Sequence, residues 1–456
     1  MKRSLIFTVL ILCSIHMVFA SFVTNTNQSA LFYRLLSRNH STDIDATYYN
    51  PAGLTQLSNG WHIALHNQTI FQEKTVINEF PFLNNSTYIG EVNVPVFPNF
   101  YMVYKKDNLA LSFGFGPNAG GGTADFSDGL PSFEAPISLL PYMLTSMGLP
   151  TTKYSADIAF KGTSVFYGFQ LNASYAVNEV FSVAAGARYI QAVNKYEGGI
   201  KNIMINPTHP LINPSGNMIP AVQFFTIAGL PADAAKVGDK AVDVKQIGSA
   251  ITPLLSVNVK PNDRLNIGIK YEFNTNLELE NETTKDDTKK FPDGEKFRND
   301  IPAILSCGIE YSLLPELRAS FSYNLFFDKN ADWGGREELI DSNTYDFAFG
   351  IEYDLTDTIL ISTGFLRTQF GMSKEYQTDF SHDLTCNTFG LGARFKMKKS
   401  LDLDIGGIYV NYLNDDKMIT YKDDDGAIIT YENIGSFRET YKRSTWCVAI
   451  GLGYHF

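Results

Sequence analysis

The chain ends, at residues 446–456, in the sequence WCVAIGLGYHF. Counted back from Phe456, every second residue is large and apolar, and the residues between them are small or polar. This period of two predicts a β-strand with one face in hydrocarbon and the other toward a lumen. A soluble sandwich can alternate in the same way, but it rarely stops on Phe, the terminal residue that bacterial barrel-insertion machinery favours. We therefore expect a transmembrane antiparallel β-barrel, with Phe456 directing insertion by the barrel-assembly machinery.

Four segments upstream repeat this alternation, and they span residues 265–273, 317–325, 345–353 and 388–397. In each, charged residues stand on one face only, because a charge on the lipid face costs about 2–4 kcal/mol at the bilayer midplane. Beyond residue 20 there is no helix-like apolar stretch of about twenty residues. The chain is therefore expected to cross the membrane with strands.

Turn signals divide the chain into short and long connections. Six tight turns are expected at 105–108, 177–179, 261–263, 315–316, 354–357 and 398–400. They alternate with seven long connections at 72–97, 117–160, 206–249, 283–300, 328–342, 372–385 and 414–440. This pattern predicts a barrel of about 14 strands with short periplasmic turns, longer external loops and both termini in the periplasm.

The first twenty residues have the three parts of a secretory signal peptide. Lys2 and Arg3 are positive, 4–19 is mostly apolar, and Ala20 provides a small residue at the cleavage position. A membrane-anchoring helix is the alternative, but the apolar run is short and polar residues follow it directly. We expect 1–20 to be removed and the mature protein to lie in the cell outer membrane of a Gram-negative bacterium.

Residues 21–57 precede the first expected strand, which starts at Trp61, and they show no period of two. They form either a free periplasmic tail or a plug folded into the lumen. A plug is physically reasonable, because a bare barrel of about fourteen strands leaves a water-filled bore. The expected organisation is a signal peptide (1–20), an amino-terminal hatch (21–57) and a transmembrane barrel (58–456).

Charge and cysteine content exclude several classes of function. The formal net charge is −11, and loss of Lys2 and Arg3 would make it more negative, which argues against nucleic-acid partners. The mature chain keeps Cys307, Cys386 and Cys447, whose spacing is unlike a metal site. An odd number leaves at least one thiol free. We expect no metal and no cofactor.

Residues 45–54 read DATYYNPAGL, and the run Asn50, Pro51, Ala52, Gly53 and Leu54 resembles the signature of the FadL family of long-chain fatty-acid transporters, which includes the toluene channel TodX. Residues 27–30 also resemble the start of the family's plug. The region 31–42 departs from the family because it lacks a glycine-rich run. Only this amino-terminal motif is specific to the family. The barrel pattern extends the resemblance over the rest of the mature chain.

The resemblance implies a barrel of about 14 strands, closed by the hatch, that passes hydrophobic molecules without an energy source. Long-chain fatty acids are the cargo it implies first. Ligand would bind an external apolar groove, reach a lumen site and leave sideways through a kink in the third strand. Here the third strand is expected at 109–116, so Gly116 and Pro117 are the candidate kink, because Pro removes a ladder hydrogen bond. An ordinary strand end would use the same residues.

Candidate ligand-binding residues fall in two groups. Two external loops are apolar, one at helical spacing, and they form either a buried loop helix or an exposed landing site; their residues are Leu139, Leu140, Met143, Leu144, Met147, Phe224 and Phe225. A ligand carboxylate would need a cation in the lumen, and the lumen-facing candidates are Arg188, Arg318 and Arg394. Most of these charges are expected to pair with carboxylates across the bore.

Other functions remain as alternatives. The strongest rival is a general diffusion porin, which would need neither a plug nor apolar external loops. A structural or adhesive barrel would also lack the hatch. Haem uptake could use His62 and His66. They are four residues apart on a strand, about 13 Å, which is too far for both to bind one iron. We find no nucleophile motif and expect no enzyme. The expected protein is a monomer whose partners are a hydrophobic small molecule and outer-membrane lipid.

Overall fold

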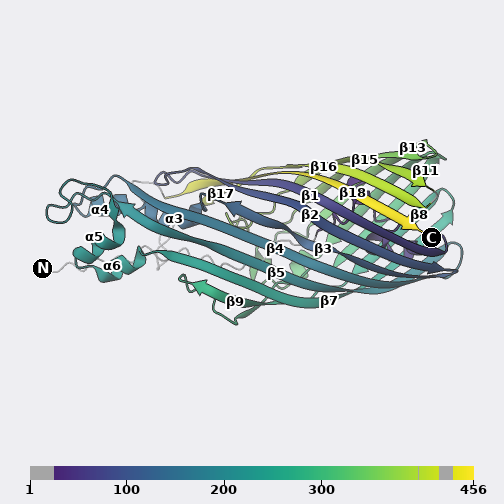
Figure 1. Ribbon diagram of the computed structural model, residues 1–456, viewed down its shortest axis with the longest axis horizontal. Helices are drawn as coiled ribbons and strands as arrows, with labels where there is room; N and C mark the ends of the chain where they lie inside the picture. The colour runs from purple at the N-terminus through teal and green to yellow at the C-terminus, as the bar shows by residue number, and fades with distance from the viewer. Residues whose placement is uncertain (1–24, 399, 421–434) are drawn as a thin grey trace.

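The protein forms one antiparallel sheet that closes on itself (Figure 1). The computed structural model describes residues 25–398, 400–420 and 435–456, so the expected signal peptide lies outside the described residues. β1 pairs with β18 and closes the sheet, with His62 opposite His455. Because β8 and β9 both pair with β7, and three further short segments also extend neighbouring strands, the described wall has 14 strands. The predicted fold class and strand number are confirmed.

The described residues contain the following elements. The helices are α1 (Ala30–Arg34), α2 (Ala46–Tyr49), η1 (Pro51–Gln56), α3 (Pro131–Ser138), α4 (Leu140–Ser146), α5 (Ala221–Ile227), α6 (Pro231–Lys236), η2 (Asp328–Asn330) and η3 (Arg336–Leu339). The strands are β1 (Gly60–Asn78), β2 (Thr87–Lys106), β3 (Leu109–Phe126), β4 (Tyr154–Ala176), β5 (Phe181–Ile205), β6 (Ile219–Pro220), β7 (Lys240–Asn262), β8 (Leu265–Glu272), β9 (Glu278–Asp286), β10 (Lys296–Arg298), β11 (Ile304–Leu314), β12 (Leu317–Phe326), β13 (Tyr345–Thr356), β14 (Ile359–Gln369), β15 (Cys386–Lys398), β16 (Leu401–Tyr412), β17 (Asp415–Ile419) and β18 (Phe437–His455).

An apolar belt surrounds the wall at the end that carries the short turns. Its side chains are among the most exposed in the protein, which is expected only where the surrounding phase is lipid. They include Leu65, Leu171, Ile251, Leu391, Trp446 and Ile450. The residues between them on the same strands face inward, as the alternation predicted.

The expected long connections 72–97, 117–160 and 206–249 are too long, because strands extend into each of them: β1 runs to Asn78 and β2 starts at Thr87, β3 runs to Phe126 and β4 starts at Tyr154, and β7 starts at Lys240. β5 has 25 residues, whereas a tilted membrane strand needs about 9–11. Beyond the belt its outward side chains are charged, and Lys195 pairs with Glu197. Since no lipid faces this part of the wall, the sequence there loses the alternation that marks a strand.

The long strands carry a cap of short helices at their far end. Figure 1 shows β4, β5 and β7 reaching past β11 to β16, with α3 to α6 near their tips. Among the described residues, no helix is both long enough and apolar enough to span a membrane. Cys307, Cys386 and Cys447 are all free thiols.

Candidate functional site

Residues 25–59, named the inner segment, lie inside the bore. Residues 28–41 and 44–55 are buried, and they include Asn50, Pro51, Ala52, Gly53 and Leu54. α1 begins at Ser29, whose hydroxyl accepts from the Phe32 amide and caps the helix. Pro51 opens η1 at a position where its missing N–H is not needed. The segment is therefore a set of short capped turns that packs by contact with the wall.

Polar side chains of the wall satisfy the backbone of the inner segment around the bore. Gln170 and Asn172 on β4 donate to the Thr47 carbonyl at 2.6 and 3.0 Å. Lys270 on β8 donates to the Tyr48 carbonyl at 2.8 Å. Farther around the wall, Ser322 on β12 accepts from the Asn39 amide at 3.0 Å. The bore is polar because it has to hydrogen-bond this segment in place of water.

Ion pairs link the inner segment to the other half of the wall. Arg34 contacts Glu352, and its Nε lies 3.2 Å from Asp404. Arg394 lies 2.7 Å from Asp43. Burial alone would raise the pKa of the Asp43 carboxyl, but Arg394 and Arg38 outweigh it and hold that pKa below its usual range.

Glycines in the wall leave room for the inner segment. A Cβ on Gly308 would lie 2.3 Å from the His40 amide nitrogen, and one on Gly268 would lie 2.3 Å from the Asn39 carbonyl oxygen. A Cβ on Gly406 would lie 2.7 Å from the Arg34 amide nitrogen. The inner segment therefore approaches the wall at backbone distance on β8, β11 and β16.

A cavity of about 370 Å³ lies beside the inner segment, between it and residues 380–383. Asn25, Thr26, Asn27 and Tyr33 border it from the inner segment. Its remaining wall mixes apolar and aromatic side chains with polar ones. The apolar and aromatic residues are Ile70, Val92, Phe126, Phe160, Tyr196, Phe326, Leu366, Phe370, Phe380, Val410 and Tyr412, and the polar ones include Gln68, Gln72, Thr163, Ser164, Asp346, Thr368, Thr388 and Thr445. This size and lining are typical of a small-molecule site.

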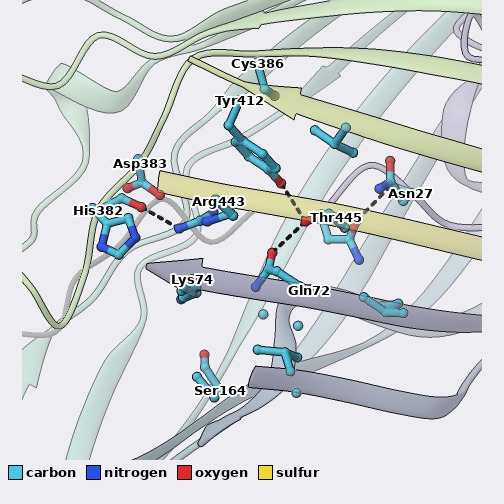
Figure 2. A pocket seen from close by; sticks show the side chains of 18 of the residues that line it. Asn27, Gln72, Lys74, Ser164, His382, Asp383, Cys386, Tyr412, Arg443 and Thr445 are labelled. Atoms are coloured by element: carbon cyan, nitrogen blue, oxygen red, sulfur yellow. Dashed lines mark hydrogen bonds between the residues drawn. The ribbon is translucent and has the colours of Figure 1, made fainter. Parts of the chain in front are cut away.

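One end of the cavity is cationic, as Figure 2 shows. Lys74 on β1 and Arg443 on β18 face it together with the Asp383 carboxylate, and neither base lies within ion-pair distance of a carboxylate of the described residues. Arg443 donates to the His382 carbonyl at 2.5 Å, while its Nε has no partner. The Ser381 hydroxyl and His382 Nε2 are also buried without partners in the described structure. Burial, Arg443 and Lys74 hold the pKa of His382 well below its usual range, so this ring is neutral.

The wall beside the cavity is incompletely paired. β2 and β3 pair from Phe100 to Lys106 and again at Gly90 and Glu91, but no register pairs join them between these stretches. β3 continues past Pro117, with register shifts against β4 at Pro117 and at Gly120. The expected end of this strand at Gly116 is therefore wrong. Proline and positive-φ glycine account for the irregular ladder, since Gly120 has φ +81°.

The three lumen arginines predicted to bind a ligand are all paired. Arg188 contacts Glu272 at 2.7 Å, Arg318 contacts Asp354 at 2.6 Å, and Arg394 contacts both Asp404 and Asp43. None of them borders the large cavity. In this structure all three form ion pairs with carboxylates of the wall, and Arg394 also pairs with the inner segment.

The apolar external loops pack against each other. Leu140 and Leu144 from α4 meet Phe224 and Phe225 from α5 in one buried cluster, so no open landing site exists at these four residues. Leu139 is buried in a neighbouring cluster, and Met143 is partly buried. Only Met147 among the seven predicted loop residues is exposed, at 43%.

Sequence reasoning missed Lys74, Arg443 and the residues 380–383. Arg443 shares the inward face of the last strand with Cys447, so extending the alternation backwards would have found it. Lys74 was assigned to a loop because the expected first strand stopped at Phe71. Nothing in the sequence marks 380–383 as folded into the bore.

A closed antiparallel wall, an apolar outer belt and a filled bore define a transmembrane β-barrel. No family model matches the chain, and no curated protein matches its sequence. Solved structures do share its fold. A FadL homologue from Pseudomonas aeruginosa is 13% identical with a TM-score of 0.67, covering 96% of this chain and 100% of its own.

Two toluene transporters also match. TodX from P. putida is 12% identical with a TM-score of 0.57, covering 91% of this chain and 95% of its own. TbuX from Ralstonia pickettii is 14% identical with a TM-score of 0.53, covering 91% and 94%. At these identities the likeness concerns the fold alone. The chain has the fold of FadL and TodX.

Proposed function

We propose that this protein is an outer-membrane channel for the passive uptake of hydrophobic molecules. The observation that carries the proposal is the cavity beside the inner segment, which many aromatic and aliphatic side chains line and which lies next to an incompletely paired stretch of wall. The named transporters with the same fold support it. A general diffusion porin fits less well, because its bore would have to conduct water and the inner segment fills this one.

We further propose that the favoured cargo is a long-chain fatty acid. Lys74 and Arg443 supply two bases at one end of the cavity that form no ion pair with the described residues, while Asp383 and Asp346 also border the cavity, and the aromatic and aliphatic side chains of the wall would hold the chain. Burial of ten methylenes contributes about 8 kcal/mol before ordering costs. That supports roughly micromolar capture and still allows release.

In this proposal the inner segment acts as a hatch, and its Asn50–Leu54 turn fastens it to the wall. Cargo leaves sideways through the wall between β2 and β3, where Gly116 and Pro117 begin the irregular stretch. Phe456 at the end of the chain directs insertion. Asn25 bonds the carbonyl of Asn118 at 2.7 Å, which would couple the hatch to that stretch.

Binding of oleate and of methyl oleate to the purified protein tests the cargo. Arg443→Met and Lys74→Met should each weaken oleate binding about 10-fold, because each removes one charge-assisted contact. Methyl oleate, which has no charge, should bind all variants alike. Lys442→Met is the matched control, since the exposed Lys442 is next in sequence and lies on the other face of β18. Unchanged oleate affinity in both cavity variants would rule out the carboxylate site.

Monoaromatic hydrocarbons are a second candidate cargo. The eight Phe and Tyr rings that border the cavity favour them, and edge-to-face contacts with such rings suit a benzene ring. This candidate would be favoured if toluene binds as tightly as oleate and if Lys74→Met and Arg443→Met leave toluene binding unchanged.

A further inference from the structure

The connection between β14 and β15, residues 371–385, is named the strap. It folds inward, and its Tyr376, Gln377, Asp379, His382 and Leu384 are buried. External barrel loops ordinarily run over the surface, because buried backbone needs hydrogen-bond partners. The strap finds these partners within itself, where the Gln377 side chain donates to the Asp383 carbonyl at 2.8 Å, and on the wall, where Arg443 donates to the His382 carbonyl and Lys417 donates to the Gln377 carbonyl.

The strap crosses the bore to the opposite wall. Around the closed sheet, β14 and β15 lie opposite β4. The Phe380 ring nevertheless packs on Phe160 of β4, with centroids 5.1 Å apart, and on Phe133 of α3 at 5.2 Å. The Ser132 amide donates to the Asp379 carboxylate at 2.9 Å. Two ring contacts and one hydrogen bond therefore join the strap to the far side.

Strap residues border the cavity opposite the inner segment. Phe380, Ser381, His382 and Asp383 line it, and Figure 2 places His382 and Asp383 beside Arg443. The unpartnered Ser381 hydroxyl and His382 Nε2 belong to the strap itself. The strap thus contributes polar groups to the cationic end, and its Phe380 contact with Phe160 borders the same cavity.

We propose that the strap is an outer gate of the channel. It swings away from β4 and α3 to admit cargo and closes with His382 and Ser381 against the bound head group. The identity of the cargo rests on the proposed function, whereas the gating motion does not. With the inner segment as a hatch, the channel would have two gates in series.

The native thiols Cys386 and Cys447 border the cavity and can report gate opening without any cargo. Their reaction with a charged, water-soluble methanethiosulfonate is measured on Cys307→Ser protein in lipid vesicles. Phe380→Ala and Asp379→Ala should raise the labelling rate about 10-fold. Lys374→Ala, an exposed residue of the same strap, is the control and should not change it. Equal rates in all folded variants, judged by heat-modifiable gel mobility, would overturn the gate.

A second experiment uses an engineered disulfide to hold the strap in its closed position. Ser132→Cys with Asp379→Cys, with the three native cysteines replaced by serine, should form a disulfide when oxidised. We expect oleate association and dissociation to slow together about 10-fold, and reductant to restore both. An unchanged association rate in protein shown to be cross-linked would contradict the gate. If oleate binds to no form of the protein, the cargo proposal fails while the thiol labelling still decides the gate.

Discussion

Asn50 fastens the inner segment to the wall with both ends of its side-chain amide. Nδ2 donates to Asn258 at 2.7 Å, and Oδ1 accepts from the Ser256 hydroxyl at 2.9 Å. A side chain at position 53 would not fit within the inner segment, since a Cβ on Gly53 would lie 2.4 Å from the Ser41 carbonyl oxygen. The sequence motif is thus a docking turn, and its residues contact the bore and each other.

Replacing Asn50 with alanine should loosen the inner segment. The change leaves Asn258 and Ser256 buried without these partners, at a cost of about 1–3 kcal/mol for each unsatisfied group. We expect residues 25–57 to become sensitive to added protease while the barrel stays folded. Asn411→Ala, on the exposed face of β16, is the matched control. Equal protection in both variants would show that other contacts hold the segment.

Asp328, just beyond β12, gives a pH dependence of defined sign. Its carboxylate accepts from the Thr344 amide at 2.9 Å, and burial raises its pKa from 3.8 to about 7. The folded loop keeps a proton that the unfolded chain releases near pH 4, so the stability of the loop is highest below about pH 4 and falls as the pH rises to about 7.

We therefore expect hydrogen exchange in 327–344, corrected for its intrinsic pH dependence, to show less protection at pH 8 than at pH 5. Asp328→Asn should remove most of that difference, whereas Asp341→Asn, an exposed residue of the same loop, should preserve it. The same pH response in both variants would assign the effect to another group.

At the scale of elements, alternation predicted the strands where they meet lipid and failed where they do not. The stretch 446–456 carries the pattern because every second side chain is solvated by hydrocarbon. The outer part of β5 carries no such pattern, and only pairing with β4 and β7 reveals it as a strand. The cavity is lined by these strand extensions and by the strap, which the alternation does not predict. The predicted ligand-binding cations are therefore not the Lys74 and Arg443 that border the cavity.

Gly308 on β11 should be sensitive to the smallest enlargement. In Gly308→Ala the new methyl group would overlap the backbone of the inner segment, and overpacking of this kind costs about 1–3 kcal/mol. We expect the variant to fold as a barrel but to release the inner segment, seen as larger single-channel conductance in planar bilayers. Gly453→Ala is the control, because its Cβ would meet nothing within 4 Å. Matching conductance in the two variants would contradict the close approach.

At the scale of the whole molecule, the proposed hatch makes a prediction about conductance, because the inner segment lies in the bore. Deleting residues 21–57 should raise single-channel conductance severalfold, because the polar bore would fill with water. The measurement uses planar bilayers, with the complete mature chain as reference. Unchanged conductance would mean that the segment does not block the bore.

The seam between β1 and β18 has a consequence for biogenesis. The inner segment continues directly into β1, and α1 contacts β16 and β18 as well as β1. Its ion-pair partners Glu352 and Asp404 are translated late, and the strand that closes the wall is translated last of all. Threading a folded segment into a finished cylinder is sterically blocked, so the two ends of the chain have to meet around it. The inner segment is therefore synthesised before the wall residues that it contacts, and it is among the last parts of the chain to reach its native contacts.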